Sequence, residues 1–222
     1  MNTADVCEVD HFVLAAPDLQ RACDEFEATT GARPTFGGAH AGRGTHNALV
    51  AFENGSYLEI IAPDPAQRPT SMSQPMAQLA KPTLMHWAVR CSGTAALATR
   101  LRDLGWSPTD VQRMSRTPPN AAKLEWELFG LKDHRYGGLA PFFIDWFDCP
   151  HPATTSPSVG PLVSMRLAYA DAAPLQGLVS ELGLDAVVTV ANGEAELAMT
   201  FDSRRGVVGY TGRAPAGFTL RD

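Results

Sequence analysis

The chain has 222 residues, of which 45% are hydrophobic, and its formal net charge is −6. This length and apolar content predict a globular protein with a proper core. No run of lysine and arginine indicates a nucleic-acid partner, and no apolar run approaches the about 18 residues that cross a membrane. The four cysteines are widely spaced, and the acidic N-terminus lacks the apolar segment of a signal peptide. We therefore expect a reduced, soluble, cytoplasmic protein.

The first part of the chain predicts a strand, a helix and then further strands. Residues 9–15 (VDHFVLA) form a short apolar run that is typical of a buried strand. We expect Asp18 to cap the following helix and Gly31 to end it, since glycine adopts the left-handed conformation without strain. A glycine-rich stretch follows at 37–47. Asn54-Gly55 is the strongest hairpin signal in the chain, and we expect an apolar strand on each side of it.

The pattern restarts after a connector at 64–82, which is rich in Pro, Gln, Ser and Ala. Residues 84–90 (LMHWAVR) predict a second buried strand, and 94–104 predict a helix. The alternation of apolar and charged residues over 123–128 indicates a half-buried strand. Residues 141–147 (PFFIDWF) indicate an apolar strand that carries a single acid.

A third, partial copy of the pattern is expected near the C-terminus. It contains a strand at 163–169, a helix at 172–182 and then strands of a meander that ends near Tyr210. Each predicted helix is closed by a glycine, and the three glycines are almost evenly spaced. Copies of a repeat pack against one another because one copy cannot close its own core. We therefore expect a first module at 1–63, a connector at 64–82, a second module at 83–149, a linker at 150–161 and an additional βαββ-like module at 162–222.

One histidine and one acid interrupt the apolar strands of each of the first two modules. His11 and Glu59 lie in the first and last strands of the first module, and His86 and Asp145 lie in those of the second. If the strand order is 1-4-3-2, the first and last strands of a module are parallel neighbours, so that histidine and carboxylate can lie together. The four side chains are then a candidate ligand set for a divalent metal such as Zn²⁺, Ni²⁺, Fe²⁺, Mn²⁺ or Co²⁺.

Simpler interpretations exist for each of these residues. A buried carboxylate without a partner costs roughly several kcal/mol, and a metal is one way to supply that partner. Alternatively, Glu59 and Asp145 each meet an arginine or lysine, or face water at a sheet edge, and each histidine is an ordinary hydrogen-bonded core residue. We favour a shared polar site because all four residues fall at equivalent positions of a repeat. Occupancy by a metal is a further hypothesis.

Several segments resemble the vicinal oxygen chelate superfamily and, within it, the glyoxalase-like proteins. These segments are DHFVL at 10–14, GGAH at 37–40, GTHN at 44–47, YLEII at 57–61 and PFFIDW at 141–146. The resemblance implies an α+β fold in which tandem βαβββ modules form a cupped mixed sheet, here followed by a C-terminal third partial module. It implies metal ligands on the first and last strands of each module, with Asp145 where bacterial glyoxalase I has a second Glu. A homodimer is one assembly that it implies.

The resemblance also implies a metal-dependent lyase or isomerase acting on a small substrate with vicinal oxygens. A metal would polarise those oxygens, and Glu59 or Asp145 would move the proton. Candidate substrate contacts are His40, Asn47 and Arg116, the last as a clamp for a carboxylate or phosphate. For His40 and Asn47 the alternative is ordinary turn chemistry. We expect His46, His134 and His151 to be solvated.

Two other functions remain open at this stage. One is a metal-free protein that binds or sequesters a small molecule in an apolar groove. The candidate walls of that groove are Trp87, Trp126, Trp146 and Phe143. The other is an Fe(II) extradiol-type dioxygenase, which needs two histidines and one carboxylate on a single face of the metal.

Overall fold

The computed structural model describes residues 7–116 and 124–213, which form one large sheet, one smaller sheet and a two-stranded pair. The first module comprises β1 (Glu8–Ala15), α1 (Leu19–Thr30), β2 (Thr35–His40), β3 (Thr45–Phe52) and β4 (Tyr57–Pro63). The connector contains α2 (Ser73–Ala77). The second module comprises β5 (Thr83–Arg90), α3 (Thr94–Asp103), β6 (Ser107–Pro108), β7 (Gln112–Arg116), β8 (Leu124–Phe129), β9 (Leu131–Lys132), the 3₁₀ helix η1 (Gly137–Leu139) and β10 (Phe142–Asp145). The remainder comprises α4 (Pro152–Thr155), β11 (Ser158–Gly160), β12 (Leu162–Tyr169), α5 (Ala173–Glu181), β13 (Val188–Asn192), β14 (Glu196–Ser203) and β15 (Gly206–Gly212).

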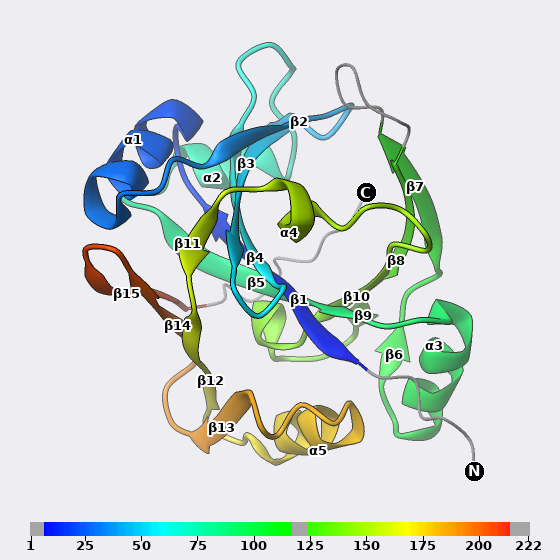
Figure 1. The fold of residues 1–222 in the computed structure, drawn as a ribbon. Helices are drawn as coiled ribbons and strands as arrows, with labels where there is room; N and C mark the ends of the chain where they lie inside the picture. The colour runs from blue at the N-terminus through cyan, green and yellow to red at the C-terminus, as the bar shows by residue number, and fades with distance from the viewer. Residues whose placement is uncertain (1–6, 117–123, 214–222) are drawn as a thin grey trace.

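The large sheet is built from the two modules joined edge to edge. Its order is β11-β3-β4-β1-β5-β10-β8-β7, with β2 paired to β3. β4 runs parallel to β1 and β10 runs parallel to β5, while β1 and β5 pair antiparallel at the centre. The order 1-4-3-2 is therefore confirmed in both modules, and so is the predicted cupped α+β fold. In Figure 1, β11 lies at the left and β7 at the right of the large sheet, and β1 and β5 cross the middle between them.

The local signals in the first module form the structures that they predict. The side chain of Asp18 accepts a hydrogen bond from the Arg21 backbone N–H at 2.7 Å, which satisfies one free donor at the start of α1. Gly31 ends the helix with φ of 79°, a left-handed conformation that favours glycine. Gly55 has φ of 85° in the turn between β3 and β4. These short-range signals fix where β1, β3 and β4 begin and end.

The alternation of side chains along the strands separates two apolar clusters. One lies on the outer face of the large sheet, where Phe12, Leu58 and Trp87 pack under the helices and the smaller sheet. The other lies on the concave face and includes Val13 and Ile144. Because neighbouring residues of a strand point to opposite faces, the second cluster borders the site described below.

The C-terminal sheet does not repeat the module topology. Its order is β13-β12-β14-β15, so β12 has β13 on one side and β14 on the other. The expected meander after the helix is therefore wrong, because β13 follows α5 by a crossover and pairs parallel with β12 directly. This sheet covers the outer face of the large one, where Phe26 of α1 stacks on Phe201 with ring centroids 5.9 Å apart.

The segment expected to be a linker at 150–161 contributes structure of its own. It forms α4 and then β11, which pairs parallel with β3 and becomes an edge strand of the large sheet. α4 begins after His151, whose ring thereby reaches β1. No helix among the described residues is long and apolar enough to cross a membrane.

The contact between the two sheets predicts a mutational effect. A Cβ atom on Gly212 would overlap the backbone carbonyl of Leu84 in β5, so we expect Gly212→Ala to destabilise the protein by about 1–3 kcal/mol. The control is Gly177→Ala within α5, where a Cβ meets nothing within 4 Å and alanine is the better helix former. Denaturant titration measures both changes in the free energy of unfolding. A Gly212→Ala variant as stable as wild type would contradict this packing.

Candidate functional site

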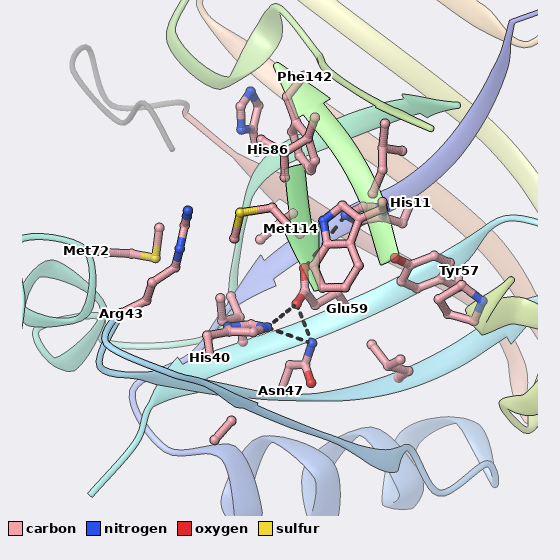
Figure 2. A pocket seen from close by; sticks show the side chains of 18 of the residues that line it. His11, His40, Arg43, Asn47, Tyr57, Glu59, Met72, His86, Met114 and Phe142 are labelled. Atoms are coloured by element: carbon pink, nitrogen blue, oxygen red, sulfur yellow. Dashed lines mark hydrogen bonds and ion pairs between the residues drawn. The ribbon is translucent and has the colours of Figure 1, made fainter. Parts of the chain in front are cut away.

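A cavity of about 460 Å³ lies on the concave face of the large sheet, and both modules line it. A volume of this size suits a small molecule. Its polar side chains include His11, His40, Arg43, Asn47, Glu59 and His86. Its apolar walls include Met72, Met76, Met114, Trp126, Phe142 and Trp146. Figure 2 shows the histidines and Glu59 pointing into this space from strands of both halves.

His11 is presented to the cavity by a bulge in β1. The pairing with β5 advances two residues on β1, from Val9 to His11, while it advances one on β5, so Asp10 is an extra residue. A bulge of this kind re-aims side chains. Because of the bulge, the side chains of the consecutive residues Asp10 and His11 contact each other. The Nδ1 atom of His11 and the Oδ1 atom of Asp10 are 2.5 Å apart. The ring of His11 also stacks on Tyr57, with centroids 4.6 Å apart.

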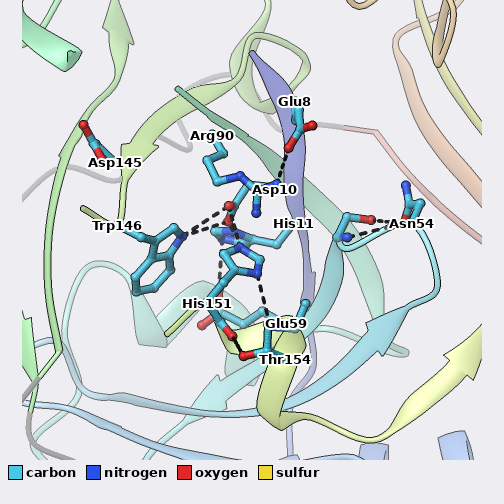
Figure 3. A network of polar contacts seen from close by, with 12 residues as sticks. Glu8, Asp10, His11, Asn54, Glu59, Arg90, Asp145, Trp146, His151 and Thr154 are labelled. Atoms are coloured by element: carbon cyan, nitrogen blue, oxygen red, sulfur yellow. Dashed lines mark hydrogen bonds and ion pairs between the residues drawn. The ribbon is translucent and has the colours of Figure 1, made fainter. Parts of the chain in front are cut away.

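Asp10 is a fully buried carboxylate with three hydrogen-bond donors (Figure 3). Besides His11, it accepts from Nε2 of His151 at 2.8 Å and from Nε1 of Trp146 at 3.2 Å. Burial alone would raise the pKa of Asp10, but the hydrogen bonds from His11 and His151 outweigh it and hold that pKa far below its usual range. An ionised Asp10 keeps the proton of His11 on Nδ1. The Nε2 atom of His11 is then left toward the cavity as a proton acceptor.

Glu59 lies opposite Nε2 of His11 and has three polar neighbours. Its Oε2 atom is 3.8 Å from Nε2 of His11, and its Oε1 atom is 3.6 Å from Nε2 of His40. The Nδ2 atom of Asn47 donates to Oε1 at 2.5 Å. This bond leaves Oδ1 of Asn47 buried without a partner, at a cost of about 1–3 kcal/mol. A Cβ on Gly37 would overlap that Oδ1 atom, so glycine is required there.

His86 occupies the second module's position equivalent to His11, but it is held differently. Its Nε2 atom donates to the backbone carbonyl of Ala140 at 2.9 Å. Burial lowers the pKa of His86 to about 4, so the ring is neutral near pH 7. The ring of Phe142 lies beside both histidines, with its centroid 5.1 Å from that of His86 and 5.2 Å from that of His11.

Asp145 does not join the other three predicted ligands. Phe142 and Ile144 line the cavity, and the alternation along β10 turns Asp145 away from it. The carboxylate accepts from the backbone N–H groups of Gly93 at 3.1 Å and Phe147 at 2.9 Å, so it supports the turns after β5 and β10. Figure 3 shows it apart from the Asp10 network. The placement of Asp145 beside His86 in the cavity is thus corrected.

The strand register explains why the acid was misplaced. Glu59 pairs with Val13, two residues after His11, whereas Phe142 pairs with Ala88, two residues after His86. Phe142 is therefore the structural counterpart of Glu59. The predicted His-Glu-His-Asp set does not converge, and neither does a face of two histidines and Glu59. Among the described residues, no three or more His, Cys, Asp or Glu side chains are grouped as metal ligands.

The other predicted contacts fall in different places. His40 and Asn47 line the cavity, as do Trp126 and Trp146, whereas Trp87 and Phe143 are buried in the outer core. Arg116 ends β7, and its side chain lies outside the described residues.

The sequence interpretation missed two participants in the site. His151, expected in solvent, is bound to Asp10, and its side chain is 13% exposed. Asp10 itself was noted only within the DHFVL segment. The one signal for it was an acid in an apolar strand, because neither the bulge nor the approach of α4 can be derived from spacing.

Comparisons with known proteins agree with this fold. A family model described as a glyoxalase-like domain matches residues 9–183, well over half of the chain. The chain belongs to this glyoxalase-like family, and with it to the vicinal oxygen chelate superfamily. No curated protein matches it in sequence.

Solved structures are similar to this glyoxalase-like chain at low sequence identity. A hypothetical protein from Staphylococcus aureus has 12% identity and a TM-score of 0.64, with 92% of this chain and 99% of that chain covered. Methylmalonyl-CoA epimerase from Mycobacterium tuberculosis has 19% identity and a TM-score of 0.47, over 70% of this chain and 97% of that one. A variant of the Streptomyces coelicolor epimerase in complex with 2-nitronate-propionyl-CoA has 16% identity and a TM-score of 0.47, over 62% and 95%. The Staphylococcus aureus structure supports the shared fold and nothing beyond the fold.

The Asp10 network predicts a loss of stability when its charge is removed. In Asp10→Asn, the amide NH₂ group cannot accept a hydrogen bond, so at least one buried donor among His11, His151 and Trp146 is left unpaired. We expect the free energy of unfolding at pH 7 to fall by about 1–3 kcal/mol. The control is Asp148→Asn at an exposed position, which should stay within about 0.5 kcal/mol of wild type. Equal effects of the two substitutions in denaturant titration would contradict the network.

The burial of His86 predicts a specific acid sensitivity. Its pKa falls from 6.5 in the unfolded chain to about 4 in the folded one, so protonation favours unfolding. The contribution of His86 to stability is complete above pH 6.5 and is lost as the pH falls toward 4. In His86→Gln, the dependence of unfolding free energy on pH should flatten across this window. The idea fails if the His86→Gln and wild-type curves run parallel.

Proposed function

We propose that this glyoxalase-like protein is an isomerase-type enzyme that transfers a proton at the carbon next to a carbonyl group of a small molecule with vicinal oxygens. The main support is one observation: the Glu59 carboxylate and Nε2 of His11 lie 3.8 Å apart in one cavity, and each is held by a neighbouring side chain. Asn47 holds Glu59, and Asp10 holds His11. Two proton acceptors at this separation have room to act on neighbouring atoms of one substrate.

Glu59 is the group that removes the proton from carbon. Its side chain is only 13% exposed, so little water competes with the substrate. The bond from Asn47 keeps Oε1 in place and leaves Oε2 to take the proton. The substrate becomes an enolate and Glu59 becomes a neutral acid. Return of that proton to the same carbon, or to the adjacent one, completes an epimerisation or an isomerisation.

His11 handles the proton on oxygen. With Nδ1–H donated to Asp10, Nε2 accepts the proton of a substrate hydroxyl and returns it to the neighbouring oxygen. The negative charge of Asp10 stabilises the ring while it carries both protons. Asp10 is thus a positioning residue, because it acts on the substrate through His11.

The proposed chemistry uses side chains of the chain and assigns no step to a metal. The donor set that the sequence suggested does not fit one: Asp145 faces away from the cavity, and Phe142 lies where the second acid would be. Proton transfer at carbon should therefore survive treatment with a chelator.

The test follows hydrogen–deuterium exchange at the α-carbon of acetoin and benzoin in D₂O by NMR. These α-hydroxyketones present vicinal oxygens with a small and a large apolar body. We expect exchange with wild-type protein before and after EDTA treatment. Glu59→Gln should slow it by about 100-fold or more. The control is Glu127→Gln, a carboxylate on the same sheet that binds Thr94 and does not line the cavity.

Exchange that persists in Glu59→Gln would contradict the role of Glu59. Exchange that EDTA abolishes and added metal restores would contradict the assignment of all steps to side chains. No exchange with either ketone in wild type would favour a second candidate, a protein that only binds its small molecule. The observation that favours this candidate is the apolar wall of Met72, Met114 and Trp126.

A further inference from the structure

We infer that the ligand of this cavity is an organic carboxylate with an apolar body, and that Arg43 binds its carboxylate group. This inference rests on the proposed function only in placing the ligand in the same cavity. Among the lining residues that the structure describes, Arg43 is the one arginine or lysine and Glu59 is the one acid. Figure 2 shows Arg43 on the Met72 side of the cavity, apart from Glu59.

The backbone around Arg43 is held by the connector. The N–H group of Gly42 donates to Oε1 of Gln67 at 2.9 Å, and the hydroxyl group of Thr70 donates to the carbonyl of Arg43 at 2.7 Å. Gly44 closes the turn with φ of 68°, and a Cβ there would crowd the carbonyl of Arg68. The Cα atom of Arg43 therefore has a fixed position over the cavity, although it lies in a loop.

The guanidinium group has no acidic partner within the part of the chain that the structure describes. Ion pairs are recorded there for eight other arginines, but none involves Arg43. A planar guanidinium group binds a carboxylate with two parallel hydrogen bonds, and this geometry is its preferred use at a binding site. An arginine left without an acid in a half-buried cavity is therefore matched to an anionic ligand.

The rest of the cavity favours an apolar body on that ligand. Met72 and Met76 line the cavity from the connector, and Met114 and Trp126 line it from the strands of the second module. Methionine side chains adapt to varied apolar shapes. A very polar anion, such as a sugar phosphate, would leave the apolar side chains of this wall without apolar contacts. An alkyl or aryl carboxylate covers this wall with its apolar body and reaches Arg43 with its carboxylate group.

The experiment compares 4-phenylbutanoate with 4-phenylbutanamide, which has nearly the same shape and no charge. Binding is followed by calorimetry and by the fluorescence of Trp126 and Trp146 in the full chain. We expect the wild type to bind the carboxylate about tenfold or more tightly than the amide, as a charge-assisted pair provides. Arg43→Gln should remove this preference. The control is Arg68→Gln, which removes the same charge from an exposed residue nearby and should keep the preference.

The same titration in Glu59→Gln separates this inference from the proposed function. Glu59→Gln should still prefer the carboxylate, whether or not any exchange activity exists in wild type. Equal affinity of wild type for the two probes would overturn the inference. So would an unchanged preference in Arg43→Gln, or no binding of the carboxylate at millimolar concentration.

Discussion

The site depends on one buried charge. The Asp10 carboxylate has no contact with solvent, and it is stable only because His11, His151 and Trp146 all donate to it. These donors come from β1, from the start of α4 and from the segment after β10. One interaction thus ties the N-terminal strand to two distant parts of the chain. It also decides which nitrogen of His11 faces the cavity, so the same contact serves stability and chemistry.

The two modules share a fold but differ in the residues that they present at equivalent positions. In the first, His11 and Glu59 face each other across neighbouring parallel strands. In the second, the equivalent positions hold His86, which is bound to a backbone carbonyl, and Phe142, which is apolar. The duplication supplies both walls of the cup, and the facing histidine and carboxylate lie in the first half. Both halves belong to one chain, and both line the cavity. Arg43 and the methionines then give the cup a charged end and an apolar wall.

Sequence patterns anticipated the scaffold better than the site. Short-range signals at Asp18, Gly31 and Gly55 and the repeat itself were enough to predict the elements and the strand order, because each depends on local geometry or on the crossover rule. Predicting which side chains enter the cavity requires knowing the register between neighbouring strands. Whether Phe142 or Asp145 opposes Ala88 depends on the length of the irregular segment between β8 and β10, and a shift of one residue moves a side chain to the other face. The role of His151 was equally hidden, because α4 is placed by tertiary packing.

Asp10 keeps the proton of His11 on Nδ1, and this leaves Nε2 of His11 free toward Glu59. Long-range ¹⁵N–¹H NMR spectra of protein with labelled histidine, recorded near pH 8 and assigned through a His11→Gln variant, observe this directly. We expect His11 to carry its proton on Nδ1, whereas His86 should carry its proton on Nε2. A His11 ring protonated on Nε2 would contradict this assignment, because that ring could not accept a proton in the cavity.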